Sequence, residues 1–292
     1  MKPAPFKYIA AASLEQALAL KAEYGDDAKF LAGGQSLMPA MNFRLARPAV
    51  LIDINPLDEL AGISPQEDDG TTVGALTRYY ALESDSTFRR NFPLFGEALP
   101  HIAHPQIRNR GTIGGNLSHA DPASELPALA VALQATMKIK ASTRERTVAA
   151  ADFFQGLLTT DLGPDEMLVG IRLPAPKPRT GTCFLEVARR RGDFALAGVA
   201  ASLTIEEGGT CTHARIALCG VGETPVDASA AAAGLIGNRI TAQQMEDVAD
   251  SVQRMIEPSG NVHASPDYQR HVAGVLTRRA LATAYDRACD GG

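Results

Sequence analysis

The stretch RNRGTIGGNLSHADPASELPAL, residues 108–129, joins three glycines and an asparagine to an apolar segment. Glycine has no Cβ, so backbone N–H groups in such a loop can approach an anion closely, and paired glycines can form a concave nest of donors. Thr112 and Asn116 would add side-chain donors, and residues 125–135 have the composition of a buried helix. The stretch therefore predicts an anion-binding turn that a helix anchors in the core.

A second glycine loop, FLAGGQSLMP at residues 30–39, follows an apolar strand pattern near the N-terminus. One such loop alone is as readily explained as a plain turn between strands, but two loops facing each other would hold the two phosphates of a dinucleotide. Neither loop has the G-x-G-x-x-G spacing of a Rossmann fold or the G-x-x-x-x-G-K-[ST] spacing of a P-loop. The pair therefore favours a dinucleotide site of another architecture.

Composition limits the classes of function. The chain has 292 residues, of which 45% are hydrophobic and 21% charged, and its net charge is −5, so we expect a soluble protein of two domains. The longest basic block is Arg189–Arg191, which argues against nucleic acid as a partner. No apolar run reaches the ~18 residues of a membrane span, and the N-terminus lacks the apolar core of a signal peptide. A cytoplasmic location is expected.

Metal ligation is not expected from the sequence. The four cysteines (Cys183, Cys211, Cys219 and Cys289) include no C-x-x-C pair, so neither a zinc nor an iron–sulfur site is predicted within this chain. His119 and Asp121 have no third candidate ligand at a suitable spacing, and loop-fixing hydrogen bonds explain them better.

The order of apolar patterns predicts two units of different construction. The first 54 residues read as β-α-β-loop-β, with a crossover that suggests a partly parallel sheet. The segment LPAPKPRTG at 173–181 holds three prolines, which interrupt helices and strands alike, and it predicts a domain boundary. Three strands are expected after it, at 182–190, 195–207 and 211–222, followed by helices at 227–237, 241–256 and 265–288. This is an α+β pattern.

Four stretches carry a resemblance to a known family. AGGQSLMPAMNFRLARPAVLIDI (32–54) and the stretch 108–129 resemble the two FAD-binding signatures of the FAD-binding (medium) subunit of molybdenum hydroxylases. Xanthine dehydrogenase and aerobic carbon monoxide dehydrogenase belong to this family. RRGDFALAGVAA (190–201) and YQRHVAGVLTRRAL (268–281) resemble the C-terminal part of the same subunit.

The resemblance implies a fold as well as a cofactor. The fold is α+β, with a split two-lobe FAD-binding domain of the vanillyl-alcohol-oxidase (PCMH) type over residues 1–175, its lobes covering about 1–57 and 58–175. A smaller C-terminal domain over 179–289 would contain a three-stranded sheet and a helical layer.

Carried over by position, the resemblance also implies which residues contact FAD, and it names no catalytic residue. These are Ala32, Gly33, Gly34, Gln35, Ser36 and Leu37 in the first loop, Thr112, Ile113, Gly114, Gly115 and Asn116 in the second, and Ile102, Glu125, Leu168 and Phe194 elsewhere. Ile102 and Leu168 would line the flavin pocket, and Phe194 would pack near the ring. Glu125 stands where the family usually has an aspartate near the sugar-like portion of the cofactor, and Glu186 lies close to where some relatives carry a lysine.

The function that the resemblance implies is electron transfer. Electrons would pass from two 2Fe–2S clusters on a small partner subunit through FAD to an external acceptor, and a large subunit would carry molybdopterin. The partners would assemble as a dimer of heterotrimers acting on an N-heteroaromatic compound or carbon monoxide.

Two alternatives remain: a free-standing flavin oxidoreductase of the same fold, and a scaffold that has lost its flavin. The 5% aromatic content argues against the first, and the intact glycine loops argue against the second. Arg189–Arg191 would guide a partner, approach the flavin, or simply form a solvated strand end.

Overall fold

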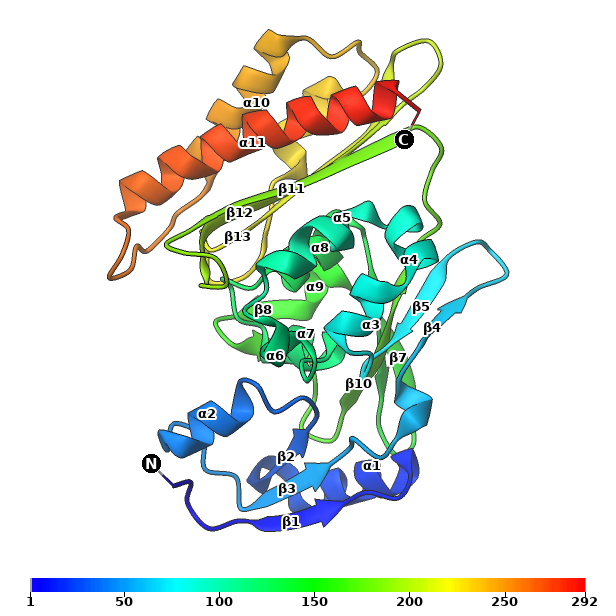
Figure 1. The fold of residues 1–292 in the computed structure, drawn as a ribbon, viewed down its shortest axis with the longest axis vertical. Coiled ribbons are helices and arrows are strands. Elements are labelled where there is room, and N and C mark those ends of the chain that lie inside the picture. Colours follow the sequence, from blue (N-terminus) through cyan, green and yellow to red (C-terminus); the bar gives the residue numbers. More distant parts are fainter. Residues whose placement is uncertain (1, 292) are drawn as a thin grey trace.

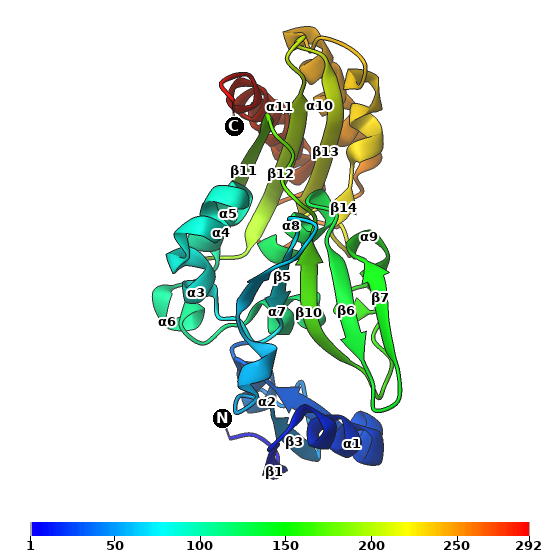
Figure 2. The same cartoon turned by 90° about the vertical axis from the view of Figure 1, so that its right-hand side faces the viewer.

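The computed structural model describes residues 2–291, and three layers follow one another along the long axis of the molecule (Figure 1). The N-terminus lies in the layer at one end and the C-terminus in the layer at the other. Figure 2 shows that each layer contains its own sheet. The α+β class is confirmed.

The first layer is a small α/β unit. Its elements are β1 (Lys7–Ala10), α1 (Leu14–Tyr24), β2 (Ala28–Leu31), α2 (Leu37–Asn42) and β3 (Val50–Asp53). Strand β3 lies between β1 and β2 and pairs with both in parallel, so the crossover expected from the sequence is present. Ser13 begins α1 by accepting a hydrogen bond from the amide of Gln16, and Gly25, with φ +53°, ends it.

The second layer is an antiparallel sheet with helices on one face. The strands are β4 (Ile63–Pro65), β5 (Thr71–Gly74), β6 (Thr136–Lys140), β7 (Glu145–Ala149) and β10 (Met167–Leu173), in the order β4-β5-β10-β6-β7. The helices are α3 (Tyr79–Ser84), α4 (Ser86–Asn91), α5 (Pro93–Ala98), α6 (Pro105–Arg108), α7 (Ile113–His119), α8 (Glu125–Ala132) and α9 (Ala150–Phe153). A small hairpin of β8 (Phe154–Gly156) and β9 (Thr159–Thr160) completes this layer.

The third layer is an antiparallel sheet covered by two long helices. It consists of β11 (Thr180–Ala188), β12 (Ala195–Ile205), β13 (Cys211–Cys219), β14 (Val226–Asp227), α10 (Ala242–Met255) and α11 (Pro266–Cys289). The expected three strands form, but the sheet has a fourth, because Val226 and Asp227 pair with β13. A two-residue strand shows no alternation that a sequence pattern could reveal. The helix expected at 227–237 is a 3₁₀ helix over Ser229–Leu235.

Helix α8 lies between the second and third layers (Figures 1 and 2). All eight of its residues are buried, as in a helix that is enclosed on every side. The apolar cluster around it includes Phe184 of β11, Ala200 of β12 and Ala217 of β13 as well as residues of the second layer. The two layers therefore share one core. The proline-rich connection at 174–179 has no regular structure.

Candidate functional site

The structure brings the two glycine loops into contact. A Cβ on Gly33 of the first loop would lie 2.4 Å from the carbonyl oxygen of Arg110 and 3.0 Å from Cα of Gly111. A Cβ on Gly115 would lie 3.8 Å from Cβ of Ala32. Glycine at position 33 is therefore required by the close approach of the second loop, and the two loops form one continuous surface.

The first loop presents a row of free amides. After β2 the chain turns at Gly34, whose φ is +72°, and enters α2. Within residues 2–291, the N–H groups of Gly33, Gly34, Gln35, Ser36 and Leu37 donate to no protein acceptor. Consecutive free N–H groups in such a turn are the donor set that a phosphate or diphosphate takes. This is the part of the site whose chemistry fits the dinucleotide that the sequence suggests.

The second loop has a different role, because most of its amides are already paired. Ile113 N–H donates to the carbonyl of Thr77 at 3.0 Å, and Gly114 N–H donates to that of Ala75 at 2.8 Å. The sequence pattern suggested a second row of exposed amides. The structure instead packs this loop against the connection between β5 and α3, and it forms a fixed wall beside the first loop.

The polar side chains of the second loop are also engaged within the protein. Thr112 Oγ1 accepts from Gly115 N–H at 3.1 Å and so caps α7. The Asn116 side-chain amide exchanges hydrogen bonds with the Ser124 hydroxyl at 2.8 and 2.9 Å. That contact holds the start of α8, where Glu125 is the first residue, against the loop.

Arg78 joins the two loops, and the sequence reasoning missed it. Its guanidinium donates to the carbonyl of Arg110 in the second loop and to Oδ1 of Asn55. Asn55 Nδ2 in turn donates to the carbonyls of Leu31 and Ala32, at 3.2 and 2.9 Å, where the first loop begins. Neither residue stands in a recognisable motif, so only the fold reveals this clamp.

The other candidate residues fall into a buried group and an exposed one. Ile102, Leu168 and Glu125 are all buried, and the first two belong to the apolar cluster around α8. Burial raises the pKa of Glu125 to about 8. Phe194 is 67% exposed, in the connection between β11 and β12, and so lies outside that cluster.

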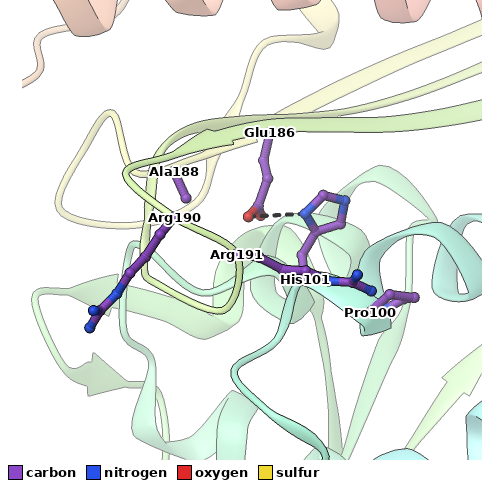
Figure 3. A pocket seen from close by; sticks show the side chains of 6 residues that line it. All are labelled: Pro100, His101, Glu186, Ala188, Arg190 and Arg191. Carbon is purple, nitrogen blue, oxygen red and sulfur yellow. Dashed lines mark ion pairs between the residues drawn. The ribbon is translucent and has the colours of Figure 1, made fainter.

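A cavity of about 420 Å³ lies where the second and third layers meet (Figure 3). Six residues line it: Pro100, His101, Glu186, Ala188, Arg190 and Arg191. His101 Nδ1 lies 3.2 Å from Glu186 Oε1. A Cβ on Gly192 would lie 2.7 Å from the carbonyl of Ala103, so the connection that carries Phe194 packs on the turn that carries Ile102.

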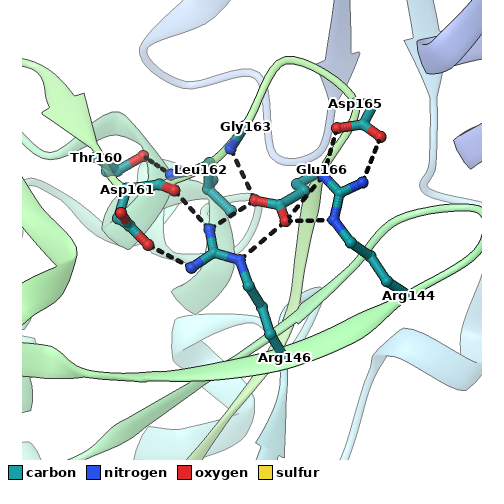
Figure 4. Close-up of polar contacts among 8 residues, drawn as sticks. All are labelled: Arg144, Arg146, Thr160, Asp161, Leu162, Gly163, Asp165 and Glu166. Atoms are coloured by element: carbon teal, nitrogen blue, oxygen red, sulfur yellow. Dashed lines mark hydrogen bonds and ion pairs between the residues drawn. The ribbon is translucent and has the colours of Figure 1, made fainter.

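An ionic network fixes the start of β10, the strand that carries Leu168 (Figure 4). Glu166 accepts hydrogen bonds from Arg146, from Arg144 and from the amide of Gly163. The bond from Arg146 is the largest cause that lowers the pKa of Glu166 to about 2. The network holds the segment before β10 against β7, and Figure 4 shows both arginines pointing toward the same carboxylate.

No group of three or more His, Cys, Asp or Glu side chains within residues 2–291 could hold a metal ion. No helix in the same range is long and apolar enough to cross a membrane.

Comparison with known proteins covers nearly the whole chain. Residues 4–176 match the FAD binding domain in molybdopterin dehydrogenase, and residues 182–284 match the CO dehydrogenase flavoprotein C-terminal domain. Caffeine dehydrogenase subunit beta of Pseudomonas sp. (strain CBB1) is 43% identical, over 98% of this chain and 97% of that protein.

Solved structures agree with these matches. A chain of carbon monoxide dehydrogenase from Hydrogenophaga pseudoflava superposes with a TM-score of 0.95 at 40% identity, over 98% of this chain and 99% of that one. A chain of quinoline 2-oxidoreductase from Pseudomonas putida 86 gives 0.93 at 38% identity, over 99% and 100%. This chain belongs to the family of FAD-binding medium subunits of molybdenum hydroxylases, and it is an oxidoreductase subunit whose cofactor is FAD.

Proposed function

We propose that the free amides of Gly33 to Leu37 hold the diphosphate of FAD, with the second glycine loop as the opposite wall. The observation that carries this proposal is the contact between the two loops together with the unpaired donors of the first. Residues 1–175 would be the FAD-binding domain, with lobes of about 1–57 and 58–175 that meet at these loops, and residues 179–289 would be the C-terminal domain. When bound, FAD supplies reversible electron transfer.

The remaining candidate residues would orient the cofactor. Ile102 and Leu168, both buried, would give the flavin an apolar wall that excludes water. Glu125, kept neutral by burial, would exchange hydrogen bonds with ribityl or ribose hydroxyls. Phe194 is on a connection that packs against the Ile102 turn, which would bring its exposed ring to the edge of the flavin.

We infer a place in an electron-transfer chain from the same family membership. Electrons would come from two 2Fe–2S clusters on a small partner subunit and leave the FAD for an external acceptor. A large subunit would hold the molybdopterin, and the complex would be a cytoplasmic dimer of heterotrimers. The substrate class would be an N-heteroaromatic compound or carbon monoxide, because caffeine dehydrogenase, quinoline 2-oxidoreductase and carbon monoxide dehydrogenase are among the relatives. On its own the chain should be yellow and should not oxidise such substrates.

The amide row can be tested by adding one charge to it. Ser36 is exposed at the start of α2, and its side chain forms no capping hydrogen bond, so replacing it removes no contact within the protein. Ser36→Asp should therefore leave the free energy of unfolding nearly unchanged. Its carboxylate would repel the diphosphate, so FAD affinity should fall about tenfold or more, since unit charges a few ångströms apart near a surface interact by a few kcal/mol.

The matched control is Ser36→Asn, which carries no charge, and it should bind FAD like the unaltered chain. Affinity is measured by flavin fluorescence titration at low salt, where the repulsion is least screened. Unchanged FAD affinity in Ser36→Asp would contradict the assignment of the diphosphate to this loop.

A further inference from the structure

The turn that carries Ile102 has a backbone conformation that alanine rarely adopts. Ala103 has a φ of +46°, in the left-handed region, which costs a residue with a Cβ about 1–2 kcal/mol. Ile102 before it is buried, and His104 after it is the N-cap of α6. A strained residue of this kind persists only where neighbouring groups hold it in place.

One side chain, that of Arg108 at the end of α6, folds back on this turn and holds it. Its Nη1 donates to the carbonyl of Ile102 at 3.1 Å and to that of Ala103 at 3.4 Å. Its Nε lies 2.8 Å from Oε1 of Glu83 on α3. The Arg108 side chain is only 13% exposed, so solvent screens these contacts little, and they fix the turn to α3.

Helix α3 also anchors the second glycine loop. Tyr79 lies one turn before Glu83 on this helix, and its N–H donates to the carbonyl of Gly111 at 3.3 Å. A Cβ on Gly111 would lie 2.4 Å from the ring of Tyr79, so the two are in close contact. The turn and the loop are therefore attached to the same short helix.

The connection between β11 and β12 in the third layer rests on the same turn. Gly192 has a φ of +80°, and a Cβ there would lie 2.7 Å from the carbonyl oxygen of Ala103. Phe194, with its exposed ring, follows two residues later. The ion pair of His101 with Glu186, drawn in Figure 3, is a second contact between the turn and the third layer. The position of the turn therefore determines where this connection lies.

We propose that Arg108 is a positioning residue for the flavin end of FAD. It acts through the Ile102–Ala103 turn, which sets the spacing between the wall at Ile102 and the connection that carries Phe194. This inference rests on the proposed function, in which Ile102 and Phe194 lie against the flavin. Within residues 2–291, Arg108 forms no hydrogen bond or ion pair with Gly33 to Leu37, so the diphosphate end does not depend on it.

The two contacts of Arg108 require a guanidinium. Nη1 and Nε belong to one rigid plane, so a single side chain reaches the carbonyls of the turn and the carboxylate of Glu83 together. Lysine has one ammonium on a flexible stem and does not hold both contacts in a fixed geometry. Arg108→Lys should therefore keep the attraction to Glu83 but loosen the turn.

The test compares two ligands, because ADP contains the diphosphate of FAD but no flavin. Arg108→Met should weaken FAD binding about tenfold, the equivalent of one charged hydrogen bond. Its affinity for ADP should change by less than about twofold, as expected for sites that act independently. FAD is titrated by flavin fluorescence and ADP by competition with FAD. The visible absorption band of the bound flavin should also move toward that of free FAD.

Two further variants make the comparison safe against a loss of folding. Arg108→Lys keeps the charge of Glu83 paired, and it should also weaken FAD while leaving ADP unchanged. Arg90→Met, at an exposed position of α4, should bind both ligands like the unaltered chain. A general loss of structure would weaken both ligands together. Equal losses of FAD and ADP affinity in the Arg108 variants, or an unchanged FAD affinity and visible band in both, would overturn the proposal.

The two proposals fail differently. Ser36→Asp should weaken FAD and ADP alike, because both carry the diphosphate. If ADP does not compete with FAD in the unaltered chain, the assignment of the diphosphate to the first loop is wrong. The visible band of the flavin in Arg108→Met still decides the role of Arg108 in that case.

Discussion

Single residues decide how the two glycine loops meet, and the glycines do not all have the same task. Gly33 makes room for the second loop, whereas Gly111 and Gly114 make room for the protein around them. A Cβ on Gly111 would lie 2.4 Å from the ring of Tyr79, and one on Gly114 would lie 2.4 Å from Cβ of Ala75. The first role of Gly111 and Gly114 is therefore in the stability of the fold, because they allow close packing within the protein.

Gly114→Ala should accordingly destabilise the fold by about 1–3 kcal/mol, the usual cost of forcing an extra methyl into a packed site. Gly156→Ala is the matched control, since a Cβ there meets nothing within 4 Å, and its free energy of unfolding should stay within about 0.5 kcal/mol of wild type. Urea denaturation of both variants measures the difference. Equal stability in the two variants would mean that the close packing of Gly114 on Ala75 does not contribute to the free energy of unfolding.

Arg78 gives the second prediction at this scale. Arg78→Met removes both hydrogen bonds of the clamp, to the Arg110 carbonyl and to Asn55, while keeping an apolar stem of similar length. With the loops less firmly joined, FAD affinity should fall about tenfold, equivalent to one charged hydrogen bond. Arg90→Met, on the exposed face of α4, serves as control in the same fluorescence titration. If Arg78→Met bound FAD with wild-type affinity, the clamp would not contribute to FAD binding.

The sequence alone predicted the two glycine loops. It did not predict that only the first loop would keep its N–H groups free. Glycine pairs followed by polar side chains predicted two loops that meet. The N–H groups of the second loop are not free because they donate to the carbonyls of Ala75 and Thr77, which lie in the connection between β5 and α3. That connection has no sequence signature. The same is true of Arg78 and Asn55, which act together only after β3 and β5 have been placed.

At the scale of elements, ion pairs between Glu166 and the arginines Arg144 and Arg146 hold the segment before β10 against β7. The side chain of Glu166 is 3% exposed and pairs with Arg146, which keeps its pKa at about 2 in the folded protein against an ordinary value of 4.5. A lowered pKa means that this stabilisation is fully present above about pH 4.5. It is lost as the pH falls from there toward 2.

Glu166→Gln should therefore cost about 2 kcal/mol at pH 7, as expected for charged hydrogen bonds to a buried group. The difference from wild type should shrink steadily as the pH falls from 4.5 to 2. Asp165→Asn, which weakens only the more exposed contact with Arg144, should cost less than about 1 kcal/mol. Unfolding curves at several pH values check both variants, and a cost for Glu166→Gln that did not vary with pH would exclude the ion pair as its source.

The elements themselves were predictable to the extent that their patterns were long. The helix α10 has a clear apolar period, and Thr241 begins it with a capping box, whereas β12 is an unbroken run of 11 buried residues and α11 is recognisable by its length of 24 residues. The strand β14 has two residues and forms only because β13 offers an edge. Helix α5 ends at Ala98 and a 3₁₀ turn over Leu99–His101 follows it, with Pro100 inside that turn, and this change of helix type places His101 at the cavity.

On the scale of the whole molecule, the second and third layers depend on each other unequally. Helix α8 is buried on all sides because the C-terminal sheet covers it. Further bonds cross the same boundary, from Gly220 N–H to the carbonyl of Pro122 at 2.8 Å and from Phe184 N–H to Glu97 at 2.8 Å. The third layer, by contrast, also has a core of its own between its sheet and the helices α10 and α11.

Cutting the chain in the proline-rich connection should reveal this asymmetry. The fragment 1–176 would leave α8 uncovered and its apolar residues exposed to water, so we expect it to aggregate or to unfold without cooperativity when expressed alone. The fragment 177–292 keeps the core between its sheet and helices, so it should be monomeric and should unfold cooperatively. Co-expression of the two fragments should make 1–176 soluble, because the sheet of 177–292 would again cover α8. Size-exclusion chromatography and thermal unfolding by circular dichroism distinguish these outcomes. A monomeric 1–176 that unfolds cooperatively without its partner would mean that the shared core around α8 does not hold the layers together.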